Sequence, residues 1–133
     1  MSKKPVHAAG KRKRAIARAT IVPGKGNVMI NNVSFDQYGN TLTRIRISEP
    51  LILAGDVAKT VDINVRVFGG GSTSQADAIR LAIARGLAMQ HEKLKSTFLS
   101  YDRQLLVADV RRKEAGKPNH HGKARAAKQK SYR

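Results

Sequence analysis

The regular patterns of apolar and polar residues are clearest in the middle of the chain. From Thr60 to Phe68, valine and isoleucine alternate with polar side chains, which predicts a half-buried strand with one wet face. Three glycines at 69–71 end this strand, and a hydroxyl residue at 72–74 can cap a helix. The helix is predicted from about Ser74 to His91, because small and aliphatic residues recur every three or four positions. Its expected buried stripe comprises Ala76, Ile79, Ala82, Ile83, Gly86 and Leu87.

The segment before this unit shows shorter patterns. Arg14 to Val22 and Asn27 to Ile30 carry apolar residues on both sides of the turn sequence Pro23-Gly24-Lys25-Gly26, which predicts a β-hairpin. Ser34 can cap a short helix that Gly39 ends. A second short helix with Leu42, Ile45 and Ile47 on one side is expected to stop near Glu49, because Pro50 follows.

The pattern weakens toward the C-terminus and then stops. Leu94 to Tyr101 suits a short helix, and Leu105 to Val110 has enough apolar character for one more strand. Residues 111–133 contain no valine, isoleucine, leucine, methionine or phenylalanine, so they are expected to be extended or disordered until a binding partner orders them. The chain of 133 residues is thus divided into an N-terminal arm at 1–12, one α/β domain at 13–110 and a tail at 111–133.

Positive charge is concentrated at the two ends of the chain. The formal net charge is +17, of which residues 1–18 contribute +7, residues 19–110 only +2 and residues 111–133 +8. An almost neutral domain with a basic segment at each end is typical of a nucleic-acid binder with arms. Both arms lack the bulky apolar face of a membrane-surface helix, so nucleic acid is the favoured partner and no membrane contact is expected.

The sequence offers little support for catalysis, a metal or a cofactor. It has no cysteine, hence neither a disulfide nor a thiolate zinc site, and no apolar stretch long enough to span a membrane. His120 and His121 are adjacent and cannot share a face, and His7 and His91 have no partners for a catalytic relay. We therefore expect an intracellular protein that is not an enzyme and takes no cofactor, metal or small-molecule substrate.

Two motifs remain open between a structural and a binding role. The glycine run could hold a phosphate at a helix N-terminus, but it lacks both nucleotide-binding signatures, so a tight strand-to-helix turn is favoured. The run Lys11-Arg12-Lys13-Arg14 could be a nuclear import signal, a solvated charge run or a phosphate contact. It leads into a strand and is matched by a second basic arm, which favours RNA contact.

The basic residues of both arms are the candidate contacts with RNA. Small residues intersperse the bases from Lys123 to the C-terminus, which lets a thin peptide thread between RNA helices. Tyr132 could stack on a base. The predicted RNA-binding residues are Lys11, Arg12, Lys13, Arg14, Arg18, Arg111, Arg112, Lys113, Lys117, Lys123, Arg125 and Lys128.

Three segments resemble the universal S-nine family of small-subunit ribosomal proteins, in its archaeal and eukaryotic form. They occur in the family's order over nearly the whole chain. They are G-K-R-K-R-A-I-A-R at 10–18, N-V-R-V-F-G-G-G-S-T-S-Q-A-D-A-I-R at 64–80 followed by A-I-A-R-G-L at 82–87, and the C-terminal Lys123-Ala124-Arg125 with Gln129, Ser131 and Arg133.

This resemblance implies a fold, a location and a set of partners. The implied fold is that of the second domain of ribosomal protein S-five, a four-stranded mixed sheet with helices on one face. The implied place is the head of the small subunit in the cytoplasm, bound to ribosomal RNA beside other head proteins. Lys130, Ser131, Tyr132 and Arg133 would then approach peptidyl-site transfer RNA. Bacterial members usually end S-K-R, so Tyr132 departs from them, and Lys130 or a stacked Tyr132 could replace the missing cation.

Two functions of other classes stay open on sequence alone. One is an enzyme that binds a nucleotide at residues 69–74, and the other is a free nucleic-acid chaperone or DNA-compacting protein, for which charge alone would suffice.

Overall fold

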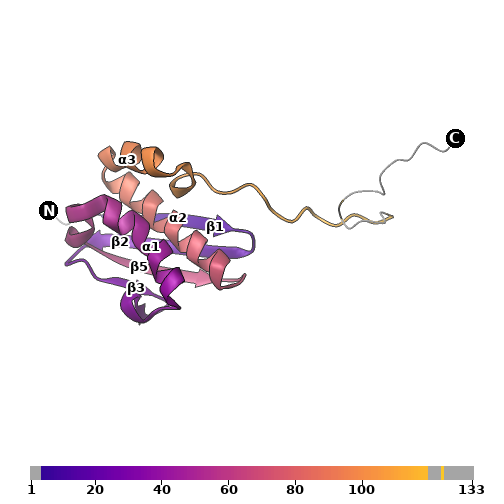
Figure 1. The fold of residues 1–133 in the computed structure, drawn as a ribbon, viewed down its shortest axis with the longest axis horizontal. Coiled ribbons are helices and arrows are strands. Elements are labelled where there is room, and N and C mark those ends of the chain that lie inside the picture. The colour runs from indigo at the N-terminus through magenta and orange to yellow at the C-terminus, as the bar shows by residue number, and fades with distance from the viewer. Residues whose placement is uncertain (1–3, 120–123, 125–133) are drawn as a thin grey trace.

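The fold is a sheet covered by helices on one face, seen here in a computed structural model that describes residues 4–119 and residue 124 (Figure 1). The strands are β1 (Val6–Arg12), β2 (Ala15–Pro23), β3 (Val28–Ile30), β4 (Val33–Ser34) and β5 (Val61–Phe68). They lie in the order β1-β2-β5-β3-β4, with β3 and β5 parallel and the other pairs antiparallel. The expected mixed sheet is confirmed, with five strands rather than four because the two-residue β4 pairs with β3.

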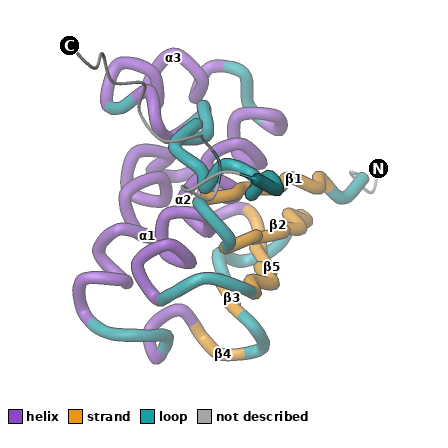
Figure 2. The backbone as a smooth tube through the Cα atoms, turned by 90° about the vertical axis from the view of Figure 1, so that its right-hand side faces the viewer, coloured by secondary structure: helices purple, strands orange, loops and turns teal. Residues whose placement is uncertain are grey.

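The helices lie on one side of this sheet, and no element of the described residues covers the opposite side (Figure 2). They are α1 (Thr41–Ala54), α2 (Ser72–Gln90) and α3 (Lys93–Tyr101), joined by short 3₁₀ turns at Phe35–Gln37, Gly55–Thr60 and Arg103–Leu105. Within the described residues no helix is long and apolar enough to cross a membrane. The long helix, the alternating strand before it and the short helix after it all lie where the sequence predicted them, within two residues.

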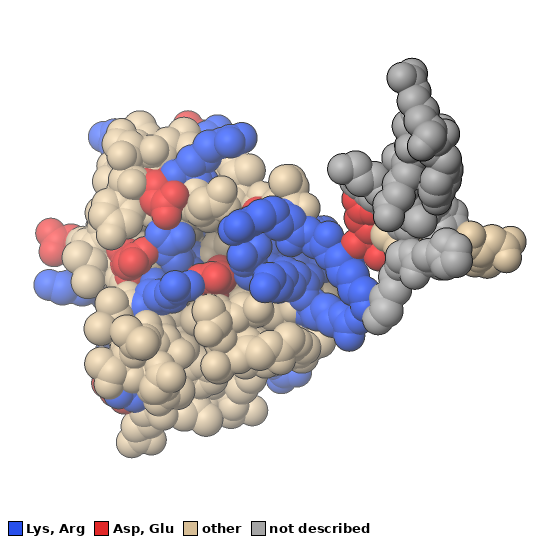
Figure 3. Space-filling model, turned by 45° about the vertical axis from the view of Figure 1, so that its right-hand side comes forward, with Lys and Arg blue, Asp and Glu red and all other residues tan. Residues whose placement is uncertain are grey.

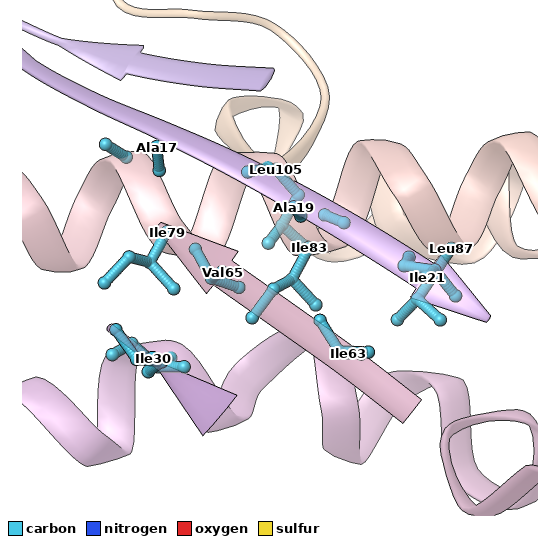
Figure 4. Packing of buried hydrophobic residues seen from close by; sticks show 14 of the residues in the cluster. Ala17, Ala19, Ile21, Ile30, Ile63, Val65, Ile79, Ile83, Leu87 and Leu105 are labelled. Atoms are coloured by element: carbon cyan, nitrogen blue, oxygen red, sulfur yellow. The ribbon is translucent and has the colours of Figure 1, made fainter. Parts of the chain in front are cut away.

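The core forms where α2 crosses the central strands (Figure 4). Each strand contributes every second residue, so Ile63 and Val65 of β5 meet Ile79 and Ile83 of α2. All four are at most 1% exposed. The predicted stripe of α2 is confirmed, since all six of its residues are buried.

Small residues let α2 approach the edge of the sheet closely. Gly10 of β1 lies under the helix, and a Cβ placed there would collide with the Ala78 carbonyl oxygen and stand 2.6 Å from the Ala82 nitrogen. On the helix, Gly86 leaves room for the side chain of Ile21 from β2. The position of β1, and of the turn that follows it, is therefore fixed by backbone contacts with α2.

The predicted hairpin of residues 14–22 with 27–30 is wrong. β2 pairs with β1 on one side and β5 on the other, and β3 pairs with β5 and β4. The connecting turn crosses the end of β5, where Asp62 accepts hydrogen bonds from the amides of Asn27 (3.0 Å) and Lys25 (2.9 Å). These two bonds hold the pKa of Asp62 below its usual value. β5 therefore pairs with β2 in the position that the sequence predicted for residues 27–30.

Two further expectations are wrong. Helix α1 does not stop before Pro50 but continues to Ala54. Pro50 is fully buried and Leu51 and Leu53 pack against the core, so burial offsets the cost of a proline inside a helix, about 3 kcal/mol. Residues 105–110 form no strand: Leu105 is buried, and the Leu106 carbonyl accepts a hydrogen bond from Arg85 (3.0 Å) instead of a sheet partner.

Candidate nucleic-acid interface

Three segments that are distant in the sequence meet in one groove of about 1110 Å³. They are the turn between β1 and β2, the start of α2 and the beginning of the tail. We call this surface the basic groove; its lining residues are Lys11, Lys13, Arg14, Gly70, Gly71, Ser74, Arg111, Arg112, Lys113, Glu114, Ala115 and Gly116. Lysine and arginine side chains form a band there that runs from the domain onto the tail (Figure 3).

The turn between β1 and β2 presents two of these bases to solvent. β1 and β2 pair up to Arg12 and Ala15, so the chain reverses over Lys13 and Arg14 alone. Lys13 has a φ of 53°, in the left-handed region, as a tight reversal requires. Both side chains are exposed. Residues 6–12, which the sequence placed in an arm, are thus the edge strand that holds this turn.

The glycine run packs against the same turn. Gly69 and Gly70 have φ values of 77° and 66°, and a Cβ on Gly69 would stand 2.5 Å from the Arg14 carbonyl oxygen. Only glycine combines this conformation with so close an approach. The favoured interpretation as a tight strand-to-helix turn is therefore confirmed, and the turn also brings the first residues of α2 beside Arg14.

The start of α2 is open to an anion. Its N-cap is Gly71, so the predicted hydroxyl cap is wrong, and no acidic residue stands in its first turn. The first N–H groups of a helix have no intrahelical partner, and the helix dipole adds partial positive charge at this end. The basic groove therefore combines backbone donors with the charges of Lys13, Arg14 and Arg112.

Arg12 has a different environment from its neighbours in the run. Its Nη1 lies 2.7 Å from Asp109 Oδ2 and its Nε lies 3.7 Å from Asp77 Oδ2, and its side chain is only 18% exposed. The contact with Asp109 is an ion pair whose angle does not suit a hydrogen bond. Arg12 is thus engaged inside the protein, whereas Lys13 and Arg14 are exposed and form no ion pair with any residue that the structure describes.

Asp109 also binds Arg111, the first residue of the tail. Arg111 donates to it from Nη2 (2.7 Å), from Nε (3.0 Å) and from its backbone amide (2.9 Å). These bonds, with the charge of Arg12, hold the pKa of Asp109 far below its usual range. We call Arg12, Asp109 and Arg111 the tail clasp. The Arg111 side chain remains 78% exposed, so the clasp fixes its position without covering it.

Further ion pairs neutralise the neighbouring surface of the helices. Arg46 binds Asp77 (2.7 Å), and Arg80 binds Glu49 (2.6 Å) and Asp102 (3.0 Å). The pKa of Asp102 is lowered, first by the amide of Gln104 and then by Arg80. Four of the nine acidic residues, Glu49, Asp77, Asp102 and Asp109, therefore gather beside the basic groove and engage arginines. Within the described residues, the groove bases Lys13, Arg14 and Arg112 have no carboxylate in an ion pair with them.

The predicted RNA-binding residues are distributed over several places. Lys11, Lys13, Arg14, Arg111, Arg112 and Lys113 line the basic groove. Arg12 lies in the tail clasp, Arg18 lies on the open face of the sheet, and Lys117 lies farther along the tail. Lys123, Arg125, Lys128, Lys130, Ser131, Tyr132 and Arg133 lie outside the described residues. Sequence reasoning missed Asp109, although an acid two residues before the basic tail was a visible signal.

The tail clasp predicts a specific pH dependence. Because the pKa of Asp109 is lowered in the folded state, its stabilising effect is present above the unfolded pKa of about 3.9 and is lost as pH falls below it. Asp109→Asn should therefore lower the urea midpoint at pH 7, and the gap from the wild type should narrow at pH 3. The matched control is Asp56→Asn, since Asp56 is fully exposed with one distant partner. An equal gap at both pH values would contradict this role.

Comparison with known proteins finds relatives that match nearly the whole chain. Residues 10–133 match the family model of ribosomal protein S9/S16. The small ribosomal subunit protein uS9 of Desulfurococcus amylolyticus is 51% identical over 98% of this chain and 94% of its own length. That of Thermoplasma volcanium is 51% identical over 93% and 95%, and that of Methanothrix thermoacetophila 47% over 98% and 99%. The chain therefore belongs to the ribosomal protein S9/S16 family.

Proposed function

We propose that this protein is a structural constituent of the small ribosomal subunit that binds ribosomal RNA through the basic groove and the tail. The observation that carries the proposal is the meeting of exposed bases with the start of α2, at the point where the tail leaves the domain (Figures 1 and 3). The names of its relatives support the same assignment, since they are small-subunit proteins. This role would place the chain in the cytoplasm, in the ribosome.

In the proposed mechanism the domain positions the groove, and the basic residues of the groove and tail bind phosphates. The near-neutral domain holds the groove in shape, and Lys13, Arg14, Arg112 and Lys113 neutralise phosphates and release their counterions. Arginine adds bidentate hydrogen bonds to phosphate, and the N–H groups at the start of α2 can donate to one phosphate directly. Lys117, Lys123, Arg125 and Lys128 would continue these contacts along the tail, and neighbouring head proteins would contact the rest of the domain.

The last residues are proposed to serve decoding rather than attachment. Lys130, Ser131, Tyr132 and Arg133 would approach transfer RNA in the peptidyl site, with Arg133 binding phosphate and Tyr132 stacking. What supports this is the direction of residues 111–119, which are exposed and lead away from the domain (Figure 1), and the apolar-poor sequence of 111–133, which can thread between RNA helices.

Reconstituted small subunits test both parts. The full chain is expected to co-sediment in stoichiometric amount at high salt, which a chaperone bound by charge alone would not do. A chain lacking residues 131–133 should still co-sediment but hold transfer RNA about 10- to 150-fold more weakly in filter binding, the effect of one charge-assisted hydrogen bond.

The outcomes separate the two roles. Release of the full chain by high salt would contradict the ribosomal role. A truncated chain that no longer enters the subunit would move the tail's end from decoding to assembly. Arg133→Lys is the matched control: it keeps the charge and should retain most of the transfer RNA affinity.

A further inference from the structure

The face of the sheet opposite the helices is not covered by any element of the described residues (Figure 2). Its central residues, Arg18, Thr20, Asn64 and Arg66, are polar or basic. Because residues alternate along each strand, the register places neighbours in rows across this face. One row joins Ile16 with Phe68, the next joins Arg18 with Arg66, and a third joins Thr20 with Asn64. Residues of the second and third rows line a shallow hollow of about 410 Å³.

Two arginines lie directly opposite each other in the middle of this face. Like charges on paired strands are destabilising, since their Cβ atoms stand only about 5 Å apart. Within the part of the chain that the structure describes, neither Arg18 nor Arg66 has a carboxylate partner. The acid on the same face is Asp62, two rows from the arginine pair, and its oxygen is engaged by amides. The pair therefore favours an anionic ligand.

An aromatic ring stands beside the arginine pair. Phe68 is 52% exposed at the end of β5, although burial is the usual place for such a side chain. The guanidinium of Arg18 lies over the ring, 5.9 Å from its centroid. Aromatic rings and arginine planes are the surfaces on which proteins stack unpaired bases. Beside them, Thr20 and Asn64 supply hydroxyl and amide groups that can bond a base edge.

We propose that this open face binds a single-stranded segment of RNA, with a base stacked on Phe68 and Arg18 and a phosphate between Arg18 and Arg66. The proposal rests on the RNA-binding function and adds a second surface with a different preference. Phe68 directly precedes the glycines that lead into the basic groove, so one RNA can pass from the groove onto the sheet. The groove contacts phosphates, whereas the sheet needs bases free to stack.

A single substitution turns the stacking position into a reporter. The chain contains no tryptophan, so Phe68→Trp introduces the sole indole while keeping an aromatic surface. Fluorescence excited at the indole is expected to be quenched by a single-stranded RNA oligonucleotide. The same RNA annealed into a duplex, and heparin, which has charge but no bases, should bind with little quenching. Ile52→Trp is the control, since Ile52 is 73% exposed on α1, and its signal should change little with any ligand.

Affinity gives a second readout. Phe68→Ala should weaken binding of the single strand by about 5- to 150-fold, the range for one base–aromatic stack, and leave duplex affinity within about twofold. Phe68 is half exposed, so this substitution should not create a cavity in the core.

Each other outcome has a defined meaning. Equal quenching by heparin and RNA would show binding by charge alone and would overturn the proposal. If the Phe68→Trp protein binds RNA but its fluorescence does not change, the sheet-face proposal is overturned and the proposed RNA-binding function still holds. If the protein binds no RNA at all, the proposed function itself is wrong. If the indole at position 68 does not respond to RNA yet is shielded from acrylamide in assembled subunits, the face belongs to a protein partner, and the proposal is wrong.

Discussion

Replacing Lys13, Arg14, Arg112 and Lys113 of the basic groove with glutamine is expected to cause the largest loss of RNA binding. Each phosphate contact releases counterions, so removing four should lower the slope of log affinity against log salt by about 3. Near 0.15 M salt, this corresponds to an affinity about 10²- to 10³-fold lower. None of the four is engaged in the tail clasp, so the fold should be retained. Titrations at several salt concentrations measure both quantities.

A control with the same loss of charge separates position from net charge. Lys59, Lys93, Lys95 and Arg103 are exposed and do not line the basic groove, and their replacement with glutamine removes four positive charges as well. This variant should keep most of the affinity. Equal losses in the two variants would mean that charge alone drives binding and that the groove has no special role.

Gly10→Ala is expected to cause the largest loss of stability. The added methyl would meet the Ala78 carbonyl and the Ala82 nitrogen, which are backbone atoms of α2 and cannot rotate away. Overpacking of this kind typically costs about 1–3 kcal/mol, and we expect about 3 kcal/mol or more here because the helix or β1 must shift as a whole. Such a shift would also displace the turn that presents Lys13 and Arg14, so RNA affinity should fall with stability.

Urea unfolding monitored by circular dichroism measures this cost. Gly71→Ala is the matched control, because a Cβ on Gly71 meets nothing within 4 Å and the N-cap change should cost less than about 1 kcal/mol. A Gly10→Ala protein within about 0.5 kcal/mol of the wild type would show that β1 is not fixed by its contact with α2.

The elements with long, regular periods were predictable, and those set by distant contacts were not. β5 and α2 bury one face over many residues, so their alternation and their helical stripe are both visible in the sequence. The sequence placed residues 6–12 in an arm because of their positive charge. Ala8 and Gly10 are small because α2 approaches β1 closely on that side, which no local pattern reveals. The hairpin was wrong because β5, far along the chain, takes the place beside β2.

The sequence predicted that the candidate site is basic, but it did not predict which of its basic side chains are exposed to a ligand. Arg12 and Lys13 are adjacent and equally basic, yet one is paired with Asp109 and the other is exposed. Their difference depends on where the chain returns after α3, which the sequence mispredicted as a strand. Likewise, the glycine run was read correctly as a turn, but only the fold places it against Arg14 and makes the start of α2 part of the basic groove.

Directed cleavage of RNA from the basic groove tests the central proposal most directly. The chain contains no cysteine, so Ser74→Cys in the groove and Ile52→Cys on α1 each provide one attachment point for an iron chelate that generates hydroxyl radicals. Both variants would be assembled into small subunits, and the cleaved ribosomal RNA mapped by primer extension. Strong cleavage from position 74 and weak cleavage from position 52 is the predicted result. Cleavage from position 52 alone would place the RNA on the helical face and contradict the assignment of the groove.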